Sequence, residues 1–393
     1  MTAEEKAVLD ILKADLFSSE IVLPKKLDWN KVVNELKAHT VAAIGLDWIS
    51  QNRPEVMKPQ WTIDSMKLYG LTMQVLHGQQ ELVELMQKNS IDIAIMKGSA
   101  AAVCYTQPTL RKMGDVDFLV REKDYEKACR IMRDNGYVYV KGNGEDFHIE
   151  YTKDGVAFEI HRRPSGVAKG KLGKSIMDII VNGLDHTEQI QYDEFSFPVL
   201  PKLQNGLTLI LHISHHLRAG LGLRQIIDWM MFVSKNLDDN TWYSEFQPVF
   251  KKLELEKLAV TVTKMCRIYL GLVSENITWC DDVSEDLCNE LISFIMEQGN
   301  FGRKKADRTT ITVLSVNKNI FWTFKNLHNR GMYNSETIRN HKLLHPFAWI
   351  YQVCRYIKYG FNRKNPIKSL RSDLDENKRR KKLISKLGIK EKR

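Results

Sequence analysis

The stretch Met96-Lys-Gly-Ser-Ala-Ala-Ala-Val-Cys-Tyr-Thr-Gln-Pro-Thr-Leu-Arg-Lys-Met-Gly-Asp-Val-Asp-Phe-Leu-Val120 combines a Gly-Ser turn with an Asp-x-Asp strand. Because an extended strand directs residues i and i+2 to the same face, Asp115 and Asp117 should present neighbouring carboxylates. Val116 and Phe118 should then point into the body of the domain. Two adjacent carboxylates repel each other unless a cation lies between them. Such oxygen ligands suit Mg²⁺, which one or two carboxylates hold together with water and substrate phosphates.

The residues before this strand predict a place where phosphate groups could bind. The run Ile91–Met96 is apolar and rich in β-branched residues, which predicts a buried strand. Gly98 would let the backbone approach a ligand closely, and Ser99 is expected at the N-cap of a following helix, where free amides, the helix dipole and a hydroxyl face an anion. Lys97 and Arg111 could add cationic contacts to phosphate oxygens. Lys97 could equally be an exposed strand end.

A third carboxylate is predicted on a neighbouring strand. The runs Asp146–Thr152 and Val156–His161 alternate polar and apolar residues around Lys153–Gly155, whose composition is typical of a hairpin turn. The apolar residues of the second run share one face, which leaves Glu159 and His161 on the other. Three clustered carboxylates are the ligand set of a two-metal phosphoryl-transfer site, with the ions about 3.5–4 Å apart. His161 is interpreted as a supporting or structural histidine rather than as a metal ligand.

The order of these motifs resembles that of the DNA polymerase β-type nucleotidyltransferase superfamily. The pattern Lys-Gly, then Tyr, Pro, Arg and Gly-Asp-x-Asp-Phe-Leu-Val is more similar to a bacterial family of uncharacterised nucleotidyltransferases, some of which are encoded beside polysaccharide-biosynthesis genes. The resemblance covers roughly Ile91 to Arg163, and the distance from the turn to the Asp-x-Asp strand is slightly longer than is usual in the superfamily. It implies that Gly98 and Ser99 form the triphosphate-binding turn and that Asp115, Asp117 and Glu159 are catalytic metal ligands. Lys97 and Arg111 join the predicted nucleotide site because they lie near this turn in the sequence.

The resemblance implies an α+β fold, in which a nucleotidyltransferase-type mixed β-sheet core lies between helical N-terminal and C-terminal segments. It also implies an enzyme that uses Mg²⁺, or Mn²⁺, in a two-metal site. Such an enzyme would transfer a nucleoside monophosphate from a nucleoside triphosphate such as ATP to a hydroxyl of a small-molecule or glycan-related acceptor. The alternative is a catalytically inactive scaffold or regulatory binding protein with the same fold, because folds host inactive relatives.

The 393 residues divide into four predicted segments. Residues 1–89 form a helical segment, 90–165 the α/β core, 166–340 a mainly helical domain, and 341–393 an aromatic helix with a polybasic tail. The acidic, polar N-terminus predicts no signal peptide, and the lack of an apolar run of about 18 residues argues against a spanning helix. The six cysteines have no C-x-x-C spacing, so we expect reduced thiols, no structural zinc and a cytoplasmic protein.

The run Leu207–Val233 predicts a helix with several titratable side chains. Spacing of i, i+4 places His212 with His216, and Arg224 with Asp228, on common faces. Because no His-Glu-x-x-His order and no obvious third ligand is present, a substrate-facing or structural role is favoured over zinc binding. Arg224 and Asp228 could also be a simple ion pair.

The C-terminal tail carries most of the net charge of the chain. Residues 363–393 contain 13 lysines and arginines against four acidic residues, while the whole chain has a formal net charge of +10. The core is therefore close to neutral, which disfavours a nucleic-acid-modifying enzyme. An aromatic helix followed by a polybasic segment could lie on the inner face of an anionic membrane or contact an acidic partner. A solvated helical tail is the simpler alternative.

Overall fold

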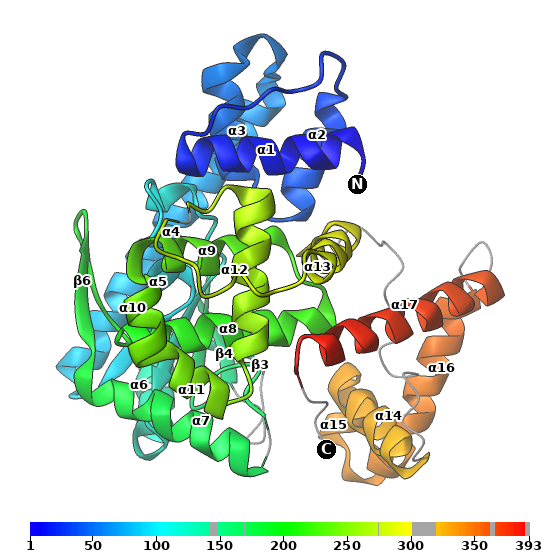
Figure 1. The fold of residues 1–393 in the computed structure, drawn as a ribbon. Coiled ribbons are helices and arrows are strands. Elements are labelled where there is room, and N and C mark those ends of the chain that lie inside the picture. Colours follow the sequence, from blue (N-terminus) through cyan, green and yellow to red (C-terminus); the bar gives the residue numbers. More distant parts are fainter. Residues whose placement is uncertain (142–147, 169, 274, 301–319, 362–365, 390–393) are drawn as a thin grey trace. The chain divides into compact units, whose positions relative to one another are not determined.

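The computed structural model describes the chain except for residues 142–147, 169, 274, 301–319, 362–365 and 390–393. The chain forms two compact units (Figure 1). The first contains residues 1–303 and 386–393, and the second contains residues 304–385. Most of the four segments predicted from the sequence therefore lie together in the first unit.

A seven-stranded mixed sheet forms the centre of the first unit, with strand order β3-β4-β5-β2-β1-β7-β6. β2 is parallel to β5 and antiparallel to β1, and β1 is parallel to β7. The strands are β1 Ile93–Met96, β2 Asp115–Val120, β3 Val138–Lys141, β4 His148–Lys153, β5 Val156–His161, β6 Glu188–Tyr192 and β7 Phe195–Val199. This arrangement confirms the predicted α+β class with a mixed-sheet core.

The sheet extends beyond the predicted core of residues 90–165. β6 and β7 form an antiparallel hairpin within the segment predicted as mainly helical, and Val199 of β7 pairs with Ile95 of β1. Phe195, Phe197 and Val199 alternate along β7 and are buried in the same core as β1 and β2. The C-terminal boundary of the core was therefore placed too early in the sequence.

Helices precede, connect and follow the strands of the first unit. They are α1 Ala3–Phe17, α2 Trp29–Ala38, α3 Ala42–Asn52, α4 Pro59–Lys88, α5 Gly98–Ala102, α6 Glu122–Asp134, α7 Gly170–Asn182, α8 Lys202–Ala219, α9 Leu223–Asn236, α10 Asp239–Thr241, α11 Gln247–Lys252, α12 Glu256–Leu270 and α13 Glu285–Gln298. α1 packs against α2 and α3 in the N-terminal part (Figure 1). The predicted helix over Leu207–Val233 is two helices, α8 and α9, because Gly220 has a φ of 122° that ends the first one.

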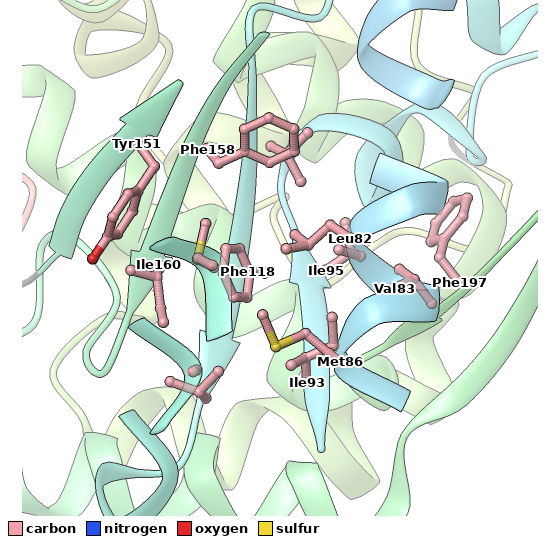
Figure 2. Close-up of a cluster of buried hydrophobic side chains, with 14 of the residues drawn as sticks. Leu82, Val83, Met86, Ile93, Ile95, Phe118, Tyr151, Phe158, Ile160 and Phe197 are labelled. Atoms are coloured by element: carbon pink, nitrogen blue, oxygen red, sulfur yellow. The ribbon is translucent and has the colours of Figure 1, made fainter. Parts of the chain in front are cut away.

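Helix α4 covers one face of the sheet with apolar side chains (Figure 2). Leu82, Val83 and Met86 lie beside the strand residues Ile93 and Ile95 in this core. The same core contains the even-numbered residues of the two central strands, namely Val116, Phe118, Val120, Val156, Phe158 and Ile160. Burying each large side chain contributes about 1.5–3 kcal/mol. The odd-numbered residues of β2 and β5 therefore face the other side of the sheet.

The second unit contains α14 Ile320–Asn334, α15 Glu336–Asn340 and α16 Ala348–Phe361. It also contains α17 Pro366–Lys386 except for the last residue of this helix, which belongs to the first unit. α14 packs against α16, and the rings of Phe324 and Trp349 lie 4.6 Å apart. The aromatic helix predicted in this segment thus corresponds to α16. In the described residues, no helix has the length and apolar character needed to cross a membrane.

Candidate functional site

A cavity of about 410 Å³ opens on the polar face of the central strands, between the sheet and helices α8 and α9. Its size is typical of sites for small molecules. Nine residues predicted from the sequence line it: Lys97, Gly98, Arg111, Asp115, Asp117, Glu159, His212, His216 and Arg224. Ser99, His161 and Asp228 were also predicted but lie behind the lining.

The parallel pairing of β2 with β5 brings three carboxylates together. Asp117 is the register partner of Glu159, and Asp115 is the partner of Ala157. All three acidic side chains line the cavity, because their neighbours at even positions are buried in the apolar core. The convergence of Asp115, Asp117 and Glu159 predicted from strand alternation is present in the structure.

Asp117 is buried and neutralised by two basic side chains. Its Oδ1 accepts a hydrogen bond from Lys97 Nζ at 2.7 Å and lies 2.7 Å from His161 Nε2. Burial alone would raise the pKa of Asp117, but Lys97 and His161 outweigh that effect and hold the pKa well below its usual value. Asp117 is therefore ionised at neutral pH, and its charge is already partly compensated.

Lys97 is neither an exposed strand end nor free to contact phosphate. It is buried, and although burial opposes its charge, Asp117 and Glu159 raise its pKa. Its backbone has φ 55° and ψ −125°, a conformation that L-residues rarely adopt and that costs about 1–3 kcal/mol. The ion pair with Asp117 offsets this strain and directs the ammonium toward the carboxylates.

The side chain of Asp115 differs from that of Asp117 because it makes no hydrogen bond or ion pair with the described residues, although both line the same cavity. Burial, followed by repulsion from Asp117 and Glu159, raises the pKa of Asp115 to about 6. Its negative charge is therefore costly in the absence of a cation. A positive ion placed in the cavity would relieve that cost.

Ser99 does not face the cavity, contrary to the prediction that its hydroxyl would contact phosphate. Helix α5 begins at Gly98, so Lys97 rather than Ser99 occupies the N-cap position. The buried Ser99 hydroxyl donates a hydrogen bond to Gln79 of α4. Gly98, by contrast, lines the cavity as predicted.

Arg111 is also committed to a partner within the protein. Its Nε and Nη2 donate to the two carboxylate oxygens of Asp228 at 3.0 and 2.7 Å, and Tyr105 donates to the same carboxylate at 2.8 Å. All three side chains are buried. The prediction that Arg111 contacts phosphate is therefore not supported, because this bidentate pair uses its guanidinium group. Asp228 pairs with Arg111 instead of with Arg224.

Arg224, on the α9 side of the cavity, has guanidinium N–H groups that could bind an anion. Its Nη1 lies 3.4 Å from the carbonyl oxygen of Lys112, and its buried Nε has no hydrogen-bond partner among the described residues. Burial and the nearby charge of Arg111 lower the pKa of Arg224, because no carboxylate fully compensates its charge. A phosphate group in the cavity would supply the missing acceptors.

The two histidines predicted to share a face of α8 are in contact. His212 Nε2 and His216 Nε2 lie 2.8 Å apart, so one ring donates a hydrogen bond to the other. Burial and the neighbouring ring lower the pKa of His212 well below its usual value, and burial lowers that of His216 to about 3. Both imidazoles are therefore neutral at physiological pH and form an uncharged polar wall of the cavity.

Sequence reasoning did not single out His148 and Glu150 of β4. In the hairpin with β5, His148 pairs with His161 and Glu150 pairs with Glu159. Both β4 residues line the cavity. The position of the turn could have predicted both residues, because the pairing of Lys153 with Val156 fixes every further pair in the hairpin.

The carboxylates facing the cavity fit a hard divalent cation such as Mg²⁺. Asp115 and Glu159 offer oxygen ligands, and burial together with repulsion from Asp117 and Glu159 raises the pKa of Asp115, so a cation at this position would stabilise its ionised form. A second group of ligand atoms, from His148, Glu159 and His161, lies within 4.8 Å of one another. The donor set therefore supports metal binding at this end of β2 and β5.

The fold and the carboxylate-lined cavity define a protein of the nucleotidyltransferase class. A family described as uncharacterised nucleotidyltransferases matches residues 25–271, and the chain belongs to this family. The matched region contains all the candidate residues described above, and the resemblance inferred from the motifs is confirmed.

Two further comparisons were made. The chain is similar to the crystal structure of an antigenic nucleotidyltransferase-like protein from Paracoccidioides brasiliensis, with 15% sequence identity and a TM-score of 0.34. The match covers 53% of this chain and 96% of that one. A comparison with curated proteins finds no match.

Proposed function

We propose that the protein transfers a nucleoside monophosphate from a nucleoside triphosphate to a hydroxyl group of a small acceptor. Family membership supports nucleotidyl transfer with a nucleoside triphosphate as the substrate. The observation that carries the proposal is the register of β2 with β5, which aligns Asp117 with Glu159 and presents both beside Asp115 to one cavity.

Asp115 and Glu159, together with Asp117, would hold Mg²⁺ or Mn²⁺ in a two-metal arrangement. When bound, such ions would neutralise the developing charge on the attacking and leaving oxygens. Lys97 already supplies one positive charge to Asp117 from within the protein. Asp115 has the least compensated charge and is therefore the residue whose removal should weaken metal binding most directly.

The triphosphate would bind beside the carboxylates, against Gly98 and Arg224 of the same cavity. Arg224 offers an unpaired guanidinium N–H, and the backbone at Gly98 lets a ligand approach closely. This assignment replaces Ser99 and Arg111, whose polar atoms bind Gln79 and Asp228. ATP is one candidate among the four ribonucleotides.

In the proposed reaction, the acceptor hydroxyl oxygen attacks the α-phosphorus of the triphosphate. The bond between the α-phosphorus and the bridging oxygen breaks, and pyrophosphate leaves. Glu159 would orient the acceptor hydroxyl and accept its proton. Arg224 would hold the phosphate oxygens in place through the transfer.

A small or glycan-related acceptor agrees with the cavity. Its volume of about 410 Å³ and the neutral pair His212 and His216 suit an uncharged, hydroxyl-bearing molecule. A link to polysaccharide biosynthesis is supported by the family resemblance alone.

The test is a screen of the four ribonucleoside triphosphates for pyrophosphate release with Mg²⁺ and a panel of hydroxyl-bearing acceptors. We expect one nucleotide to be turned over only when metal and acceptor are present, and Asp115→Asn to abolish turnover. Metal-independent pyrophosphate release, or equal release by the Asp115→Asn variant, would contradict the proposal.

The alternative is a scaffold that keeps the fold without catalysis. The observation that favours it is the ion pair of Lys97 with Asp117, which satisfies one of the three carboxylates without a metal. The screen separates the two functions, because a scaffold that binds nucleotide would show binding without pyrophosphate release with every acceptor.

We further propose that the basic tail contacts an anionic membrane surface or an acidic partner, with the protein at the inner face of the membrane. Three cations of α17 have exposed side chains, namely Lys378, Arg379 and Lys382, and Lys378 also lies 3.6 Å from Asp375. Deleting the tail is a poor test, because Leu387 is buried and Lys386 pairs with Glu290. Replacing the three exposed cations by glutamine should reduce co-sedimentation with anionic liposomes at low salt by a salt-sensitive amount. Equal sedimentation of both proteins would exclude the membrane contact.

A further inference from the structure

Two imidazole rings lie beside Glu159 and have no role in the function proposed above. His148 of β4 and His161 of β5 are register partners, and their ring centroids lie 5.1 Å apart. His161 is fully buried, while His148 is partly exposed and lines the cavity. One ring therefore lies behind Glu159, and the other lies where an ion from solvent could reach it.

The spacing of the ligand atoms suits a tetrahedral metal ion. His161 Nε2 lies 3.3 Å from one carboxylate oxygen of Glu159, and His148 Nε2 lies 3.7 Å from the other. In a tetrahedral zinc site with bonds of about 2.0–2.1 Å, neighbouring ligand atoms lie about 3.3 Å apart. The ligand atoms of all three residues lie within 4.8 Å of one another, so side-chain adjustments would bring them onto one ion.

The local charge favours a dication at this position. Asp115, Asp117 and Glu159 contribute three carboxylates, against which Lys97 and Arg224 supply two positive charges. His161 Nε2 points at the carboxylates of both Asp117 and Glu159. This nitrogen is therefore aimed at carboxylate oxygens, and it would bind a metal ion in its deprotonated form, as metal-ligating imidazoles do.

We propose that His148, Glu159 and His161 bind a divalent transition metal ion, with Zn²⁺ as the ion that the donor set favours. Imidazole nitrogen and carboxylate oxygen together prefer zinc and its neighbours, whereas Mg²⁺ requires oxygen ligands in octahedral geometry. The cavity leaves a fourth position open for water or a substrate oxygen. The site shares Glu159 with the proposed nucleotidyl-transfer centre. A role of the metal ion in that reaction rests on the proposed function, whereas the binding of the ion does not.

The experiment is a titration of the metal-free, full-length protein with Co²⁺, followed by visible absorption, and then competition with Zn²⁺ or Mg²⁺. We expect one Co²⁺ per chain with the intense visible absorption of a site with fewer than six ligands. Zn²⁺ should displace it stoichiometrically, while excess Mg²⁺ should not displace it, because Mg²⁺ prefers oxygen ligands to imidazole. Displacement by Mg²⁺, or no cobalt absorption in the folded protein, would overturn the proposal.

His148→Ala should lower the affinity for Co²⁺ more than about tenfold. His215→Ala is the matched control, because His215 lines the same cavity outside the three-residue group. Unchanged cobalt binding in His148→Ala would exclude the site, and His161→Gln provides a second variant if the first one folds poorly. Mg²⁺-dependent pyrophosphate release by the same preparation is measured separately. Its loss or survival tests the proposed function and not the zinc site.

Discussion

The two faces of the β2 and β5 strands share one backbone but are organised in opposite ways. The face covered by α4 carries buried apolar side chains that fill space: Val116, Phe118, Phe158 and Ile160. The other face carries charged and titratable groups: Asp115, Asp117, Glu159 and His161. The apolar face stabilises the fold, whereas the polar face brings together carboxylates whose mutual repulsion a bound cation would relieve.

The largest stability change should come from the apolar face. Phe118→Ala removes a fully buried ring from the core and should lower the free energy of unfolding by about 3–5 kcal/mol. Phe118→Leu is the matched variant and should cost much less, because it keeps most of the volume. Denaturant unfolding measures both. A small loss in Phe118→Ala would mean that this face does not carry the stability of the fold.

Substitutions of Arg111 and Arg224, the two arginines that line the cavity, should have opposite effects on stability and on nucleotide binding. Arg111→Ala would leave the buried Asp228 carboxylate without its bidentate partner and should cost about 3–5 kcal/mol. Arg224→Ala removes no such pair, so it should change stability little and should raise the KM for the nucleoside triphosphate. Thermal unfolding and steady-state kinetics of both variants test this contrast. The reverse pattern would assign phosphate binding to Arg111.

Asp115→Asn should stabilise the metal-free protein while abolishing metal-dependent function. The pKa of Asp115 is raised from 3.8 to about 6 in the folded state, so ionisation of this carboxyl opposes folding. The cost is absent below about pH 4, grows as the pH rises to about 6, and stays constant above that. At pH 7.5 the variant should therefore be more stable by about 1–3 kcal/mol. A variant that is less stable than the wild type at pH 7.5 would contradict this account of the polar face.

The smallest effect is expected at Ser99. Because its hydroxyl donates to Gln79 inside the protein, Ser99→Ala should lower the free energy of unfolding by about 1 kcal/mol and leave the KM for the nucleoside triphosphate unchanged. Denaturant unfolding and steady-state kinetics of the wild type and of Ser99→Ala measure both quantities. An increase in KM without a loss of stability would restore the phosphate contact expected from the sequence alone.

Local periodicity predicted the parts of the site that depend on single strands. Alternation along β2 and β5 is reliable because one face of each strand is buried, and it separated Asp115 and Glu159 from Phe118 and Phe158. The same logic extended through the hairpin turn would have found His148 opposite His161.

The remaining features depend on contacts between distant segments, which local patterns do not encode. Arg111 pairs with Asp228, 117 positions later in the chain, and Ser99 turns toward Gln79 of a preceding helix. β6 and β7 were missed because β6 is largely polar and β7 contains Pro198, which is uncommon within a sheet. Their place in the sheet is set by the tertiary pairing of β7 with β1.

The most direct test of the central claim is calorimetric titration with a non-hydrolysable nucleoside triphosphate analogue, with Mg²⁺ and with a chelator. The proposed role of the polar face predicts Mg²⁺-dependent binding by the wild type and by Phe118→Leu, and loss of the Mg²⁺ dependence in Asp115→Asn. Binding of equal strength with and without Mg²⁺, or unchanged Mg²⁺-dependent binding by Asp115→Asn, would contradict the assignment of this face as a metal-dependent nucleotide site.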